Sequence, residues 1–210
     1  MNSGQGYFLT FEGIDGSGKT TQLELLKADL EEADISYLLL REPGGTSISE
    51  QIRTILLDND NSEMTSETEL LLFAAARSQL VQEIVKPALA QNKIVISDRF
   101  YDSTTAYQGF GRDIDVDFIL DLNQYATLNL QPDLTFYFDI SVDTALARLG
   151  KRSNKADRID LESKVFMEKT RQGYLKIAEW YPDRIRVINA ERSPQMIYQD
   201  LRKYLHEMMT

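Results

Sequence analysis

The sequence contains no cysteine among its 210 residues, which excludes disulfide bonds and thiolate metal sites. It lacks an apolar run long enough to span a bilayer, and its polar start, Met-Asn-Ser-Gly-Gln, has no signal-peptide apolar region. Its 23 lysine and arginine residues are outnumbered by 33 acidic ones, and the net charge of −10 argues against broad nucleic-acid binding, which needs lysine and arginine. We therefore expect a cytoplasmic protein with no membrane or nucleic-acid partner, and a single α/β domain over residues 1–210.

The segment from Gly13 to Thr20 matches the phosphate-binding pattern G-x-x-x-x-G-K-[ST] at every fixed position. It follows a predicted buried strand and opens a predicted helix, so backbone N–H groups and the helix N-terminus can face a phosphate chain. Lys19 is expected to reach the β- and γ-phosphates, and the Thr20 hydroxyl can ligate Mg²⁺. The predicted ATP-binding residues are Gly13, Ile14, Asp15, Gly16, Ser17, Gly18, Lys19 and Thr20.

Strand and helix patterns alternate along the whole chain. Apolar strands are predicted at Tyr7–Phe11, Ser36–Leu40, Lys93–Ser97, Leu134–Asp139 and Arg184–Ile188. Helices are predicted at Thr20–Glu32, Ser47–Leu57, Ser66–Gln91, Asp115–Ala126, Val142–Leu149, Leu161–Tyr181 and Pro194–Met208. This alternation predicts an α/β fold of the P-loop NTPase type, with a five-stranded parallel sheet flanked by helices on both faces. Ligands would then bind at the carboxyl ends of the strands.

Asp98 and Arg99 directly follow the predicted strand Lys93–Ser97. An acidic residue at this place is the usual Mg²⁺ partner of a P-loop, often through water, and Arg99 suits a second phosphate group. A surface pair that caps the strand is the alternative. Asn154-Lys155-Ala156-Asp157 fits the guanine-reading motif N-K-x-D of GTPases, but it follows a helix rather than a buried strand. A GTPase switch therefore stays only a minor alternative.

The predicted helix Ser66–Gln91 carries an arginine on its apolar face. Arg77 lies four residues after Phe73, so the two side chains project together. A guanidinium on an apolar face must be paired or meet a ligand. Two interpretations stay open at this point: Phe73 stacks on a base while Arg77 donates to its carbonyl edge, or Phe73 packs in the core and Arg77 snorkels to water.

A basic segment interrupts the acidic composition between Arg148 and Arg158. Five cations stand there against the single acid Asp157, with Gly150, Ser153 and Asn154 between them. Such a segment suits a lid, at about residues 148–160, that closes over a phosphate chain and excludes water. A solvated basic loop is the alternative. Arginine delivered by a lid can accelerate phosphoryl transfer by about 10³–10⁵-fold.

Several motifs together resemble the thymidylate kinase family. They are the P-loop with its flanks, Phe11 to Thr21, then Arg41-Glu42-Pro43-Gly44-Gly45-Thr46, Leu72-Phe73-Ala74-Ala75-Ala76-Arg77, Asp98-Arg99-Phe100 and Ala106-Tyr107-Gln108-Gly109. No arginine stands at the variable P-loop positions, so the chain resembles the bacterial type, whose catalytic arginines come from the lid. The resemblance implies a cytosolic homodimeric enzyme of nucleotide biosynthesis that converts ATP and dTMP to ADP and dTDP with Mg²⁺.

The resemblance also implies residue roles. Asp15 would accept from the deoxyribose 3′-hydroxyl, Phe73 would stack on thymine, and Arg77 would contact its polar edge. Tyr107 would lie against the sugar and Gln108 would face the nucleoside. The dTMP-binding set is Asp15, Arg41, Arg53, Phe73, Arg77, Arg99, Ser103, Tyr107 and Gln108. The catalytic set is Lys19, Arg99, Arg148 and Arg152, and the expected Mg²⁺ partners are Thr20 and, through water, Asp98.

Phosphoryl transfer to an acceptor that is already an anion needs no strong general base. Catalysis then consists of positioning and charge neutralisation, without a covalent enzyme intermediate. Three alternatives stay open: another nucleoside monophosphate kinase, a GTPase switch, and a nucleotide-binding regulatory protein without turnover. A regulatory protein without turnover is disfavoured because the residues expected to act in phosphoryl transfer are all present: Lys19, Thr20, Asp98 and Arg99.

Overall fold

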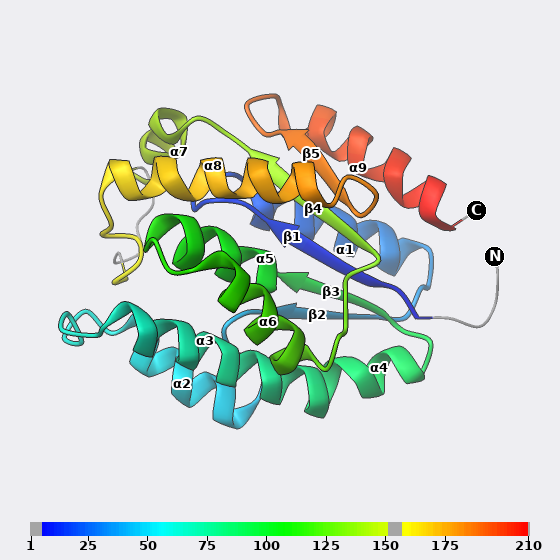
Figure 1. Ribbon diagram of the computed structural model, residues 1–210. Coiled ribbons are helices and arrows are strands. Elements are labelled where there is room, and N and C mark those ends of the chain that lie inside the picture. The colour runs from blue at the N-terminus through cyan, green and yellow to red at the C-terminus, as the bar shows by residue number, and fades with distance from the viewer. Residues whose placement is uncertain (1–5, 151–156, 210) are drawn as a thin grey trace.

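The computed structural model describes residues 6–150 and 157–209, and its centre is one five-stranded sheet (Figure 1). Neighbouring strands are all parallel, in the order β2-β3-β1-β4-β5. The strands are β1 Phe8–Glu12, β2 Tyr37–Arg41, β3 Ile94–Asp98, β4 Leu134–Asp139 and β5 Ile185–Asn189. The predicted sheet is confirmed, with strand bounds within one residue of the predicted ones.

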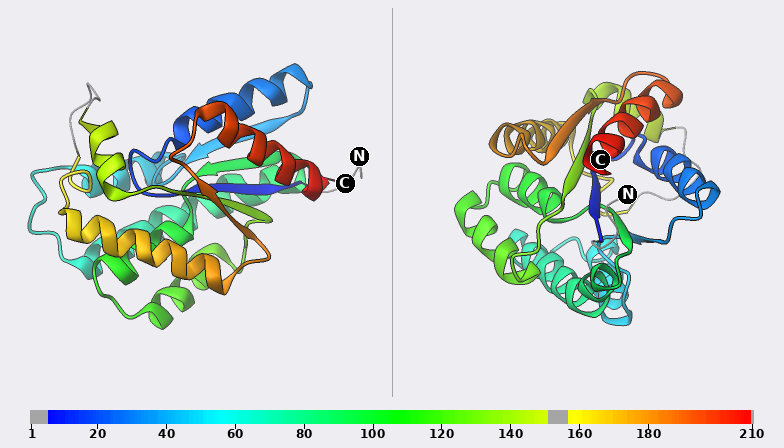
Figure 2. Two further views of the ribbon diagram at one scale, coloured as in Figure 1. Left: turned by 90° about the horizontal axis from the view of Figure 1, so that it is seen from above. Right: turned by 90° about the vertical axis from the view of Figure 1, so that its right-hand side faces the viewer.

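Helices cover both faces of this sheet, as Figures 1 and 2 show. The longer ones are α1 Lys19–Glu32, α2 Ser47–Leu57, α3 Ser66–Leu80, α6 Val116–Thr127, α7 Val142–Leu149, α8 Lys164–Trp180 and α9 Pro194–Met209. The shorter helical segments are η1 Val81–Val85, α4 Lys86–Ala90, α5 Tyr101–Thr104 and η2 Thr105–Gly111, of which η1 and η2 are π-helical. No helix in the described ranges is long and apolar enough to cross a membrane.

Alternate residues of each central strand point to opposite faces, and the core divides accordingly. Leu9 and Phe11 of β1 pack with Phe136 of β4 in the cluster that contains the buried residues of α1 and α9. Phe8 of β1 and Val95 of β3 instead pack against η1 and α5. Because both faces are covered, the strands are apolar along their length rather than alternating.

Two segments differ from the sequence-based assignment. No helix was predicted between Asp98 and Asp115, yet α5 and η2 form a continuous helical segment from Tyr101 to Gly111. Its two glycines and its β-branched Thr104-Thr105 pair disfavour a helix locally. Tertiary packing overrides this preference: a Cβ built on Gly111 would lie 2.6 Å from the Phe166 ring of α8, so only glycine allows the close approach.

The other differences concern helix bounds. The predicted helix Ser66–Gln91 is interrupted by a π-helical turn, where the Lys86 N–H reaches back five residues to the Val81 carbonyl, just before Pro87. The helix predicted to begin at Leu161 begins at Lys164, because the Ser163 side chain caps it by accepting the Phe166 N–H.

Candidate functional site

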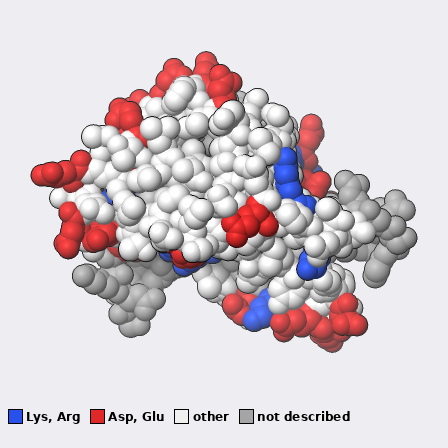
Figure 3. All heavy atoms as spheres, turned by 90° about the horizontal axis from the view of Figure 1, so that it is seen from below, with Lys and Arg blue, Asp and Glu red and all other residues white. Residues whose placement is uncertain are grey.

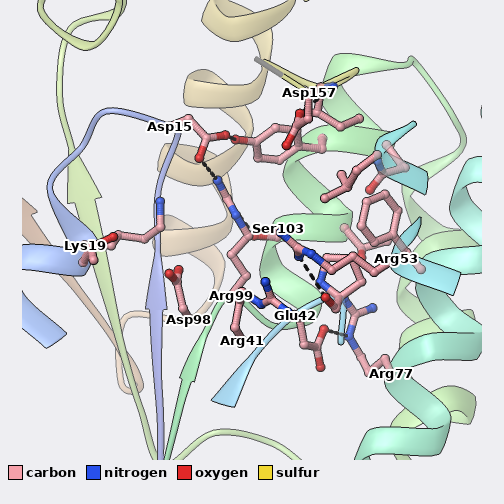
Figure 4. A pocket seen from close by; sticks show the side chains of 18 of the residues that line it. Asp15, Lys19, Arg41, Glu42, Arg53, Arg77, Asp98, Arg99, Ser103 and Asp157 are labelled. Atoms are coloured by element: carbon pink, nitrogen blue, oxygen red, sulfur yellow. Dashed lines mark hydrogen bonds and ion pairs between the residues drawn. The ribbon is translucent and has the colours of Figure 1, made fainter. Parts of the chain in front are cut away.

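A pocket opens at the carboxyl ends of β1, β2 and β3, where the loops after these strands meet α3 and η2 (Figure 4). Most of the predicted site residues line it, although they come from segments far apart in the sequence. These are Asp15, Gly16, Gly18, Lys19, Thr20, Arg41, Arg53, Phe73, Arg77, Asp98, Arg99, Ser103, Tyr107 and Gln108. In Figure 4, Lys19 and Asp98 lie toward one end of the pocket, Glu42 and Arg77 toward the other, and Arg99 between them.

The loop between β1 and α1 adopts a conformation that needs glycine. Gly16 has φ +84°, and a Cβ there would lie 2.6 Å from the Ala145 carbonyl oxygen of α7. Gly18, at φ 93°, forms the N-cap of α1 and brings the first turn of the helix to the pocket. The Lys19 ammonium folds over this loop and donates to the carbonyls of Gly13 at 2.8 Å and Ile14 at 3.3 Å. Burial and the Arg99 charge lower the pKa of Lys19.

Four predicted residues of the described chain do not line the pocket. Ile14 is part of the core beside α1, and Ser17 is buried, so a phosphate would meet these residues through their backbone. The Gly13 carbonyl is occupied by Lys19 and by the Arg99 guanidinium, which donates to it at 2.9 Å. Arg148, in the last turn of α7, donates to the carbonyls of Gly16 and Ala190 beside the loop. Arg152 lies outside the described residues.

Arg99 occupies the middle of the pocket with a left-handed backbone, φ 73°, which non-glycine residues adopt mainly where the surroundings enforce it. Its guanidinium donates to the Asp15 carboxylate at 2.9 Å, to the Ser103 hydroxyl at 3.2 Å and to the Tyr174 hydroxyl at 3.3 Å. The guanidinium also lies over the Tyr107 ring, 5.1 Å from its centroid. The capping-pair alternative is therefore wrong, because Arg99 faces into the pocket.

Arg77 is buried in an ion pair, with a side chain 2% exposed. Its Nε donates to Glu42 Oε2 at 2.8 Å, and its terminal nitrogens donate to the Phe100 carbonyl and the Asn123 side chain. The idea that Arg77 snorkels to water is thus wrong. Burial raises the pKa of Glu42, and the Arg77 charge opposes this shift, so each group depends on the other.

Phe73 and two arginines, Arg41 and Arg53, also line the pocket. Phe73 is only half-buried and faces the pocket, which favours the ligand-stacking interpretation over core packing. Arg53 of α2 donates to the Pro43 carbonyl at 2.9 Å, and burial together with the Arg41 charge lowers its pKa. Arg41 pairs with Glu50 at 2.9 Å while it lines the pocket.

Glu12 is a buried acid that was not predicted as a site residue, and it shares the hydroxyl groups of Ser103 and Tyr174 with Arg99. Glu12, at the end of β1, is fully buried, and its oxygens accept from the Phe100 N–H at 2.7 Å, the Ser103 hydroxyl at 2.6 Å and the Tyr174 hydroxyl at 2.9 Å. Burial, reinforced by the nearby Asp102 charge, raises the pKa of Glu12 from 4.5 to about 7.

Replacing Glu12 with glutamine is expected to change how stability depends on pH. The folded protein holds the Glu12 proton more tightly than the unfolded chain does, because its pKa rises from 4.5 to about 7. The stabilising contribution of this proton is therefore complete below the unfolded pKa and is lost as the pH rises to about 7. The E12Q variant should gain about 2–3 kcal/mol in unfolding free energy relative to the native protein between pH 5 and pH 8.

Urea unfolding at both pH values measures this effect. Glu24→Gln, at an exposed position of α1, serves as the matched control and should show no such gain. An E12Q difference that is the same at pH 5 and pH 8 would show that Glu12 does not hold a proton in this range.

Other pocket residues were also missed from the sequence. Glu42, Pro43, Leu57, Thr104, Asp157 and Ile159 line the pocket without having been predicted to do so. Glu42 and Pro43 stand inside a motif that had been noted, so their place in the sequence was a usable signal. Leu57 carries no local signal, whereas Asp157 and Ile159 lie inside the predicted lid segment at about 148–160 but were not assigned to the nucleotide site. The approach of residues 157–163 to the end of α2 brings the three together, as the Arg158 Nε bond to the Leu56 carbonyl shows.

Comparison with known proteins adds to this geometry. A sequence profile of the family described as thymidylate kinase matches residues 11–201. The chain belongs to the thymidylate kinase family. The thymidylate kinase of Geotalea uraniireducens is 51% identical over 195 residues, which cover 90% of this chain and 92% of the relative. That of Mycoplasma capricolum is 47% identical, with coverage of 96% and 95%, and that of Clostridium novyi is 43% identical, with coverage of 96% and 98%.

Family membership settles the predicted class of the protein. It is a nucleotide-binding transferase of the thymidylate kinase family rather than a GTPase switch. The segment Asn154 to Asp157 had matched the guanine-binding motif N-K-x-D of GTPases. Of its four residues, Asn154 to Ala156 lie outside the described residues. Asp157 uses its Oδ1 to accept the backbone N–H groups of Ile159 and Asp160, which is a turn-forming role.

Proposed function

We propose that this thymidylate kinase family member transfers the γ-phosphoryl group of ATP to dTMP in the central pocket, with Mg²⁺ and without a covalent enzyme intermediate. One observation carries the proposal: cationic side chains from separate segments line one cavity together with a half-buried aromatic ring, Phe73. Two anionic nucleotides that meet end to end need such cations, since their phosphates repel each other.

The acceptor nucleotide would occupy the end formed by α3 and η2. Phe73 offers a flat apolar face for the thymine base, and Arg77 stands on the same helix face four residues later. Arg99, in the middle of the pocket, would hold the acceptor phosphate together with Arg41 or Arg53. Asp15 would then accept from the sugar 3′-hydroxyl, beside the Tyr107 hydroxyl that approaches its carboxylate at 3.4 Å.

The donor phosphates would occupy the glycine-rich loop and the first turn of α1. The Lys19 ammonium already lies over this loop, so exchanging its bonds to backbone carbonyls for bonds to a phosphate needs only a side-chain movement. A bound phosphate also offsets the burial of the Lys19 charge. Backbone N–H groups of the loop and the α1 N-terminus supply further stabilisation.

The residues at this end fit Mg²⁺. Asp98 Oδ1 is buried and has no hydrogen-bonding partner in the described structure, and Asp98 and Thr20 both line the pocket. Within residues 6–150 and 157–209, no group of three or more acidic or histidine side chains forms a ready-made metal cage. This suits Mg²⁺, which keeps several waters and binds through one or two protein oxygens plus phosphates. When bound, the ion would neutralise charge on the phosphates while Thr20 and Asp98 orient it.

The transferring group would receive further positive charge from the segment at about 148–160, which we propose acts as a lid. Arg148, at the end of α7, is near the loop, since its guanidinium donates to the Gly16 carbonyl. It would turn to the phosphates together with Arg152. A cytoplasmic location follows from the resemblance to the family alone.

Measuring ADP production with each common nucleoside monophosphate as acceptor tests this function. With ATP and Mg²⁺ held constant, dTMP should give the highest kcat/KM. Preference for dUMP or for a ribonucleotide would point to a different nucleoside monophosphate kinase. No ADP production with any acceptor would contradict a kinase function.

The proposed homodimer would form through the face of α2, α3 and α6. Large apolar side chains are exposed on these helices and just after α6: Ile48, Ile55, Leu71, Phe118, Tyr125 and Leu128. Figure 3 views this side of the molecule and shows a broad uncharged area with acidic residues mainly around its edge. In a chain of net charge −10, an uncharged face is where two copies can approach without repulsion.

Replacing Phe118 and Tyr125 together with glutamate is expected to convert the dimer to a monomer, because four charges would face each other across the two-fold axis. Sedimentation equilibrium measures the mass. Val165→Glu changes an exposed apolar residue on α8, away from this face, and should leave the dimer intact. A native protein that sediments as a monomer, or a double variant that still dimerises, would contradict the proposal.

A further inference from the structure

Gln108 is fixed in the pocket wall by an acid that sequence analysis did not single out. Its Nε2 donates to Glu69 Oε1 at 2.9 Å, and the Gln108 and Glu69 side chains are both buried, 2% and 1% exposed. Glu69 lies in the first turn of α3, on the helix that carries Phe73 and Arg77, whereas Gln108 belongs to η2. The bond therefore joins two walls of the acceptor end of the pocket.

The surroundings of Glu69 keep it ionised. Arg112 donates to both carboxylate oxygens, at 3.1 Å and 3.0 Å, and Arg158 donates to Oε2 at 2.5 Å. Burial opposes ionisation, but hydrogen bonds from Arg112, Gln108 and Arg158 lower the pKa of Glu69. An ionised carboxylate has no proton to donate, so it can only accept hydrogen bonds.

This chemistry decides which way the Gln108 amide points. Because Glu69 can only accept, the NH₂ group must face it, and the opposite orientation would set the amide oxygen against the carboxylate. The Gln108 carbonyl oxygen is then the polar atom of the side chain that remains for a ligand. Within the described residues, no hydrogen bond to this oxygen competes for it.

We propose that Glu69 is a positioning residue for acceptor selectivity: it fixes the Gln108 amide so that the pocket presents a hydrogen-bond acceptor to the base. This inference rests on the proposed function, and it concerns the choice among pyrimidine acceptors. Thymine and uracil carry a donor N–H at ring position 3, whereas cytosine has an acceptor lone pair there. A fixed Gln108 carbonyl oxygen can accept the N3–H of thymine or uracil. With cytosine the same oxygen would face the N3 lone pair, so cytosine is disfavoured.

The test replaces Glu69 with glutamine and measures kcat/KM for dTMP and dCMP at constant ATP. A glutamine at position 69 can donate as well as accept, so the Gln108 amide is no longer held in one orientation. The ratio of kcat/KM for dTMP over dCMP should fall about tenfold or more, the effect of one misaligned hydrogen bond. The change should be in the KM of the acceptor, with the KM of ATP within about twofold of the native value.

Glu162→Gln is the matched control for this variant. Glu162 also pairs with Arg112, at 2.6 Å, and does not bond Gln108, so E162Q removes a similar charge without freeing the amide. Its dTMP/dCMP ratio should equal that of the native protein. An equal fall in the E69Q and E162Q ratios would assign the effect to Arg112 and overturn the proposal.

The same measurement in a Gln108→Leu background separates positioning from a general structural effect. If Glu69 acts through Gln108, adding E69Q to Q108L should leave the dTMP/dCMP ratio unchanged. If E69Q lowers the dTMP/dCMP ratio equally in the native protein and in Q108L, Glu69 acts by another route and the inference is wrong.

A crystal structure of the native protein with dTMP provides a readout that does not depend on how the variants fold. The thymine N3 should lie within hydrogen-bonding distance of the Gln108 amide. A thymine carbonyl oxygen in that place would overturn the inference, since two acceptors would face each other. If the native protein does not phosphorylate dTMP, the proposed function fails; if it does and the E69Q ratio is unchanged, only the inference about Glu69 fails.

Discussion

Replacing Lys19 with alanine is expected to lower kcat by at least about 100-fold, the order of effect seen when one preorganised charge-stabilising donor is removed. The ammonium lies over the glycine-rich loop, and its loss removes one of the charges that would stabilise the transferring phosphoryl group. The fold should persist. The Gly13 carbonyl keeps its hydrogen bond from Arg99, and removing a buried cation also removes its desolvation cost.

Steady-state ADP production and thermal unfolding measure the two parts of this prediction. The control is Lys27→Ala, which removes a cation from the same helix but outside the pocket. K27A should turn over as the native protein does. A K19A protein with the native melting temperature and near-native kcat would show that the glycine-rich loop does not act as proposed.

The Arg77→Met variant is expected to lose about 3–5 kcal/mol of unfolding free energy, because it leaves the buried Glu42 carboxylate without its partner. This is a large part of the 5–15 kcal/mol that typically stabilises a domain. The variant should also bind dTMP more weakly while its affinity for ATP changes little. Denaturant unfolding and calorimetric titration with each nucleotide measure these effects.

A second substitution separates stability from recognition at this site. In the double variant E42Q/R77M no buried charge remains at these two positions, so most of the lost stability should return. Weak dTMP binding should persist, because the guanidinium that would contact the base is still absent. If the double variant recovers dTMP affinity along with stability, Arg77 serves the fold and not the nucleotide. An equal loss of ATP and dTMP affinity in R77M would also count against its thymine role.

Local patterns were sufficient for the sheet and the phosphate loop. Each β-strand is a short apolar run bounded by turn residues, and the loop from Gly13 to Thr20 is one continuous segment whose chemistry depends on its own backbone. The segment from Tyr101 to Gly111 could not be assigned in this way. Its glycines disfavour a helix, and the contact between Gly111 and Phe166 of α8 that explains them appears only in the folded chain.

The hydrogen-bonding partners of the site residues could likewise not be predicted from local sequence patterns. The pattern at Arg77 indicated that this guanidinium must be paired, yet its partner Glu42 is 35 residues away. Tyr174 reaches Glu12 across 162 residues, and Glu69 reaches Gln108 across 39. None of these pairs has a periodic or spacing signal, because each depends on which strands and helices become neighbours.

The sequence by itself determined the fold class, the phosphate loop and the family resemblance, since these depend on contiguous segments and their periodicity. Only the tertiary structure decided how the charges are paired: Arg77 with Glu42, Arg99 with Asp15, and Glu69 with Gln108 and two arginines. The physical reason is that a buried charge must find its partner in space. The parallel sheet gathers loops from distant parts of the chain at one edge, and the spacing along the chain does not specify which side chains meet there.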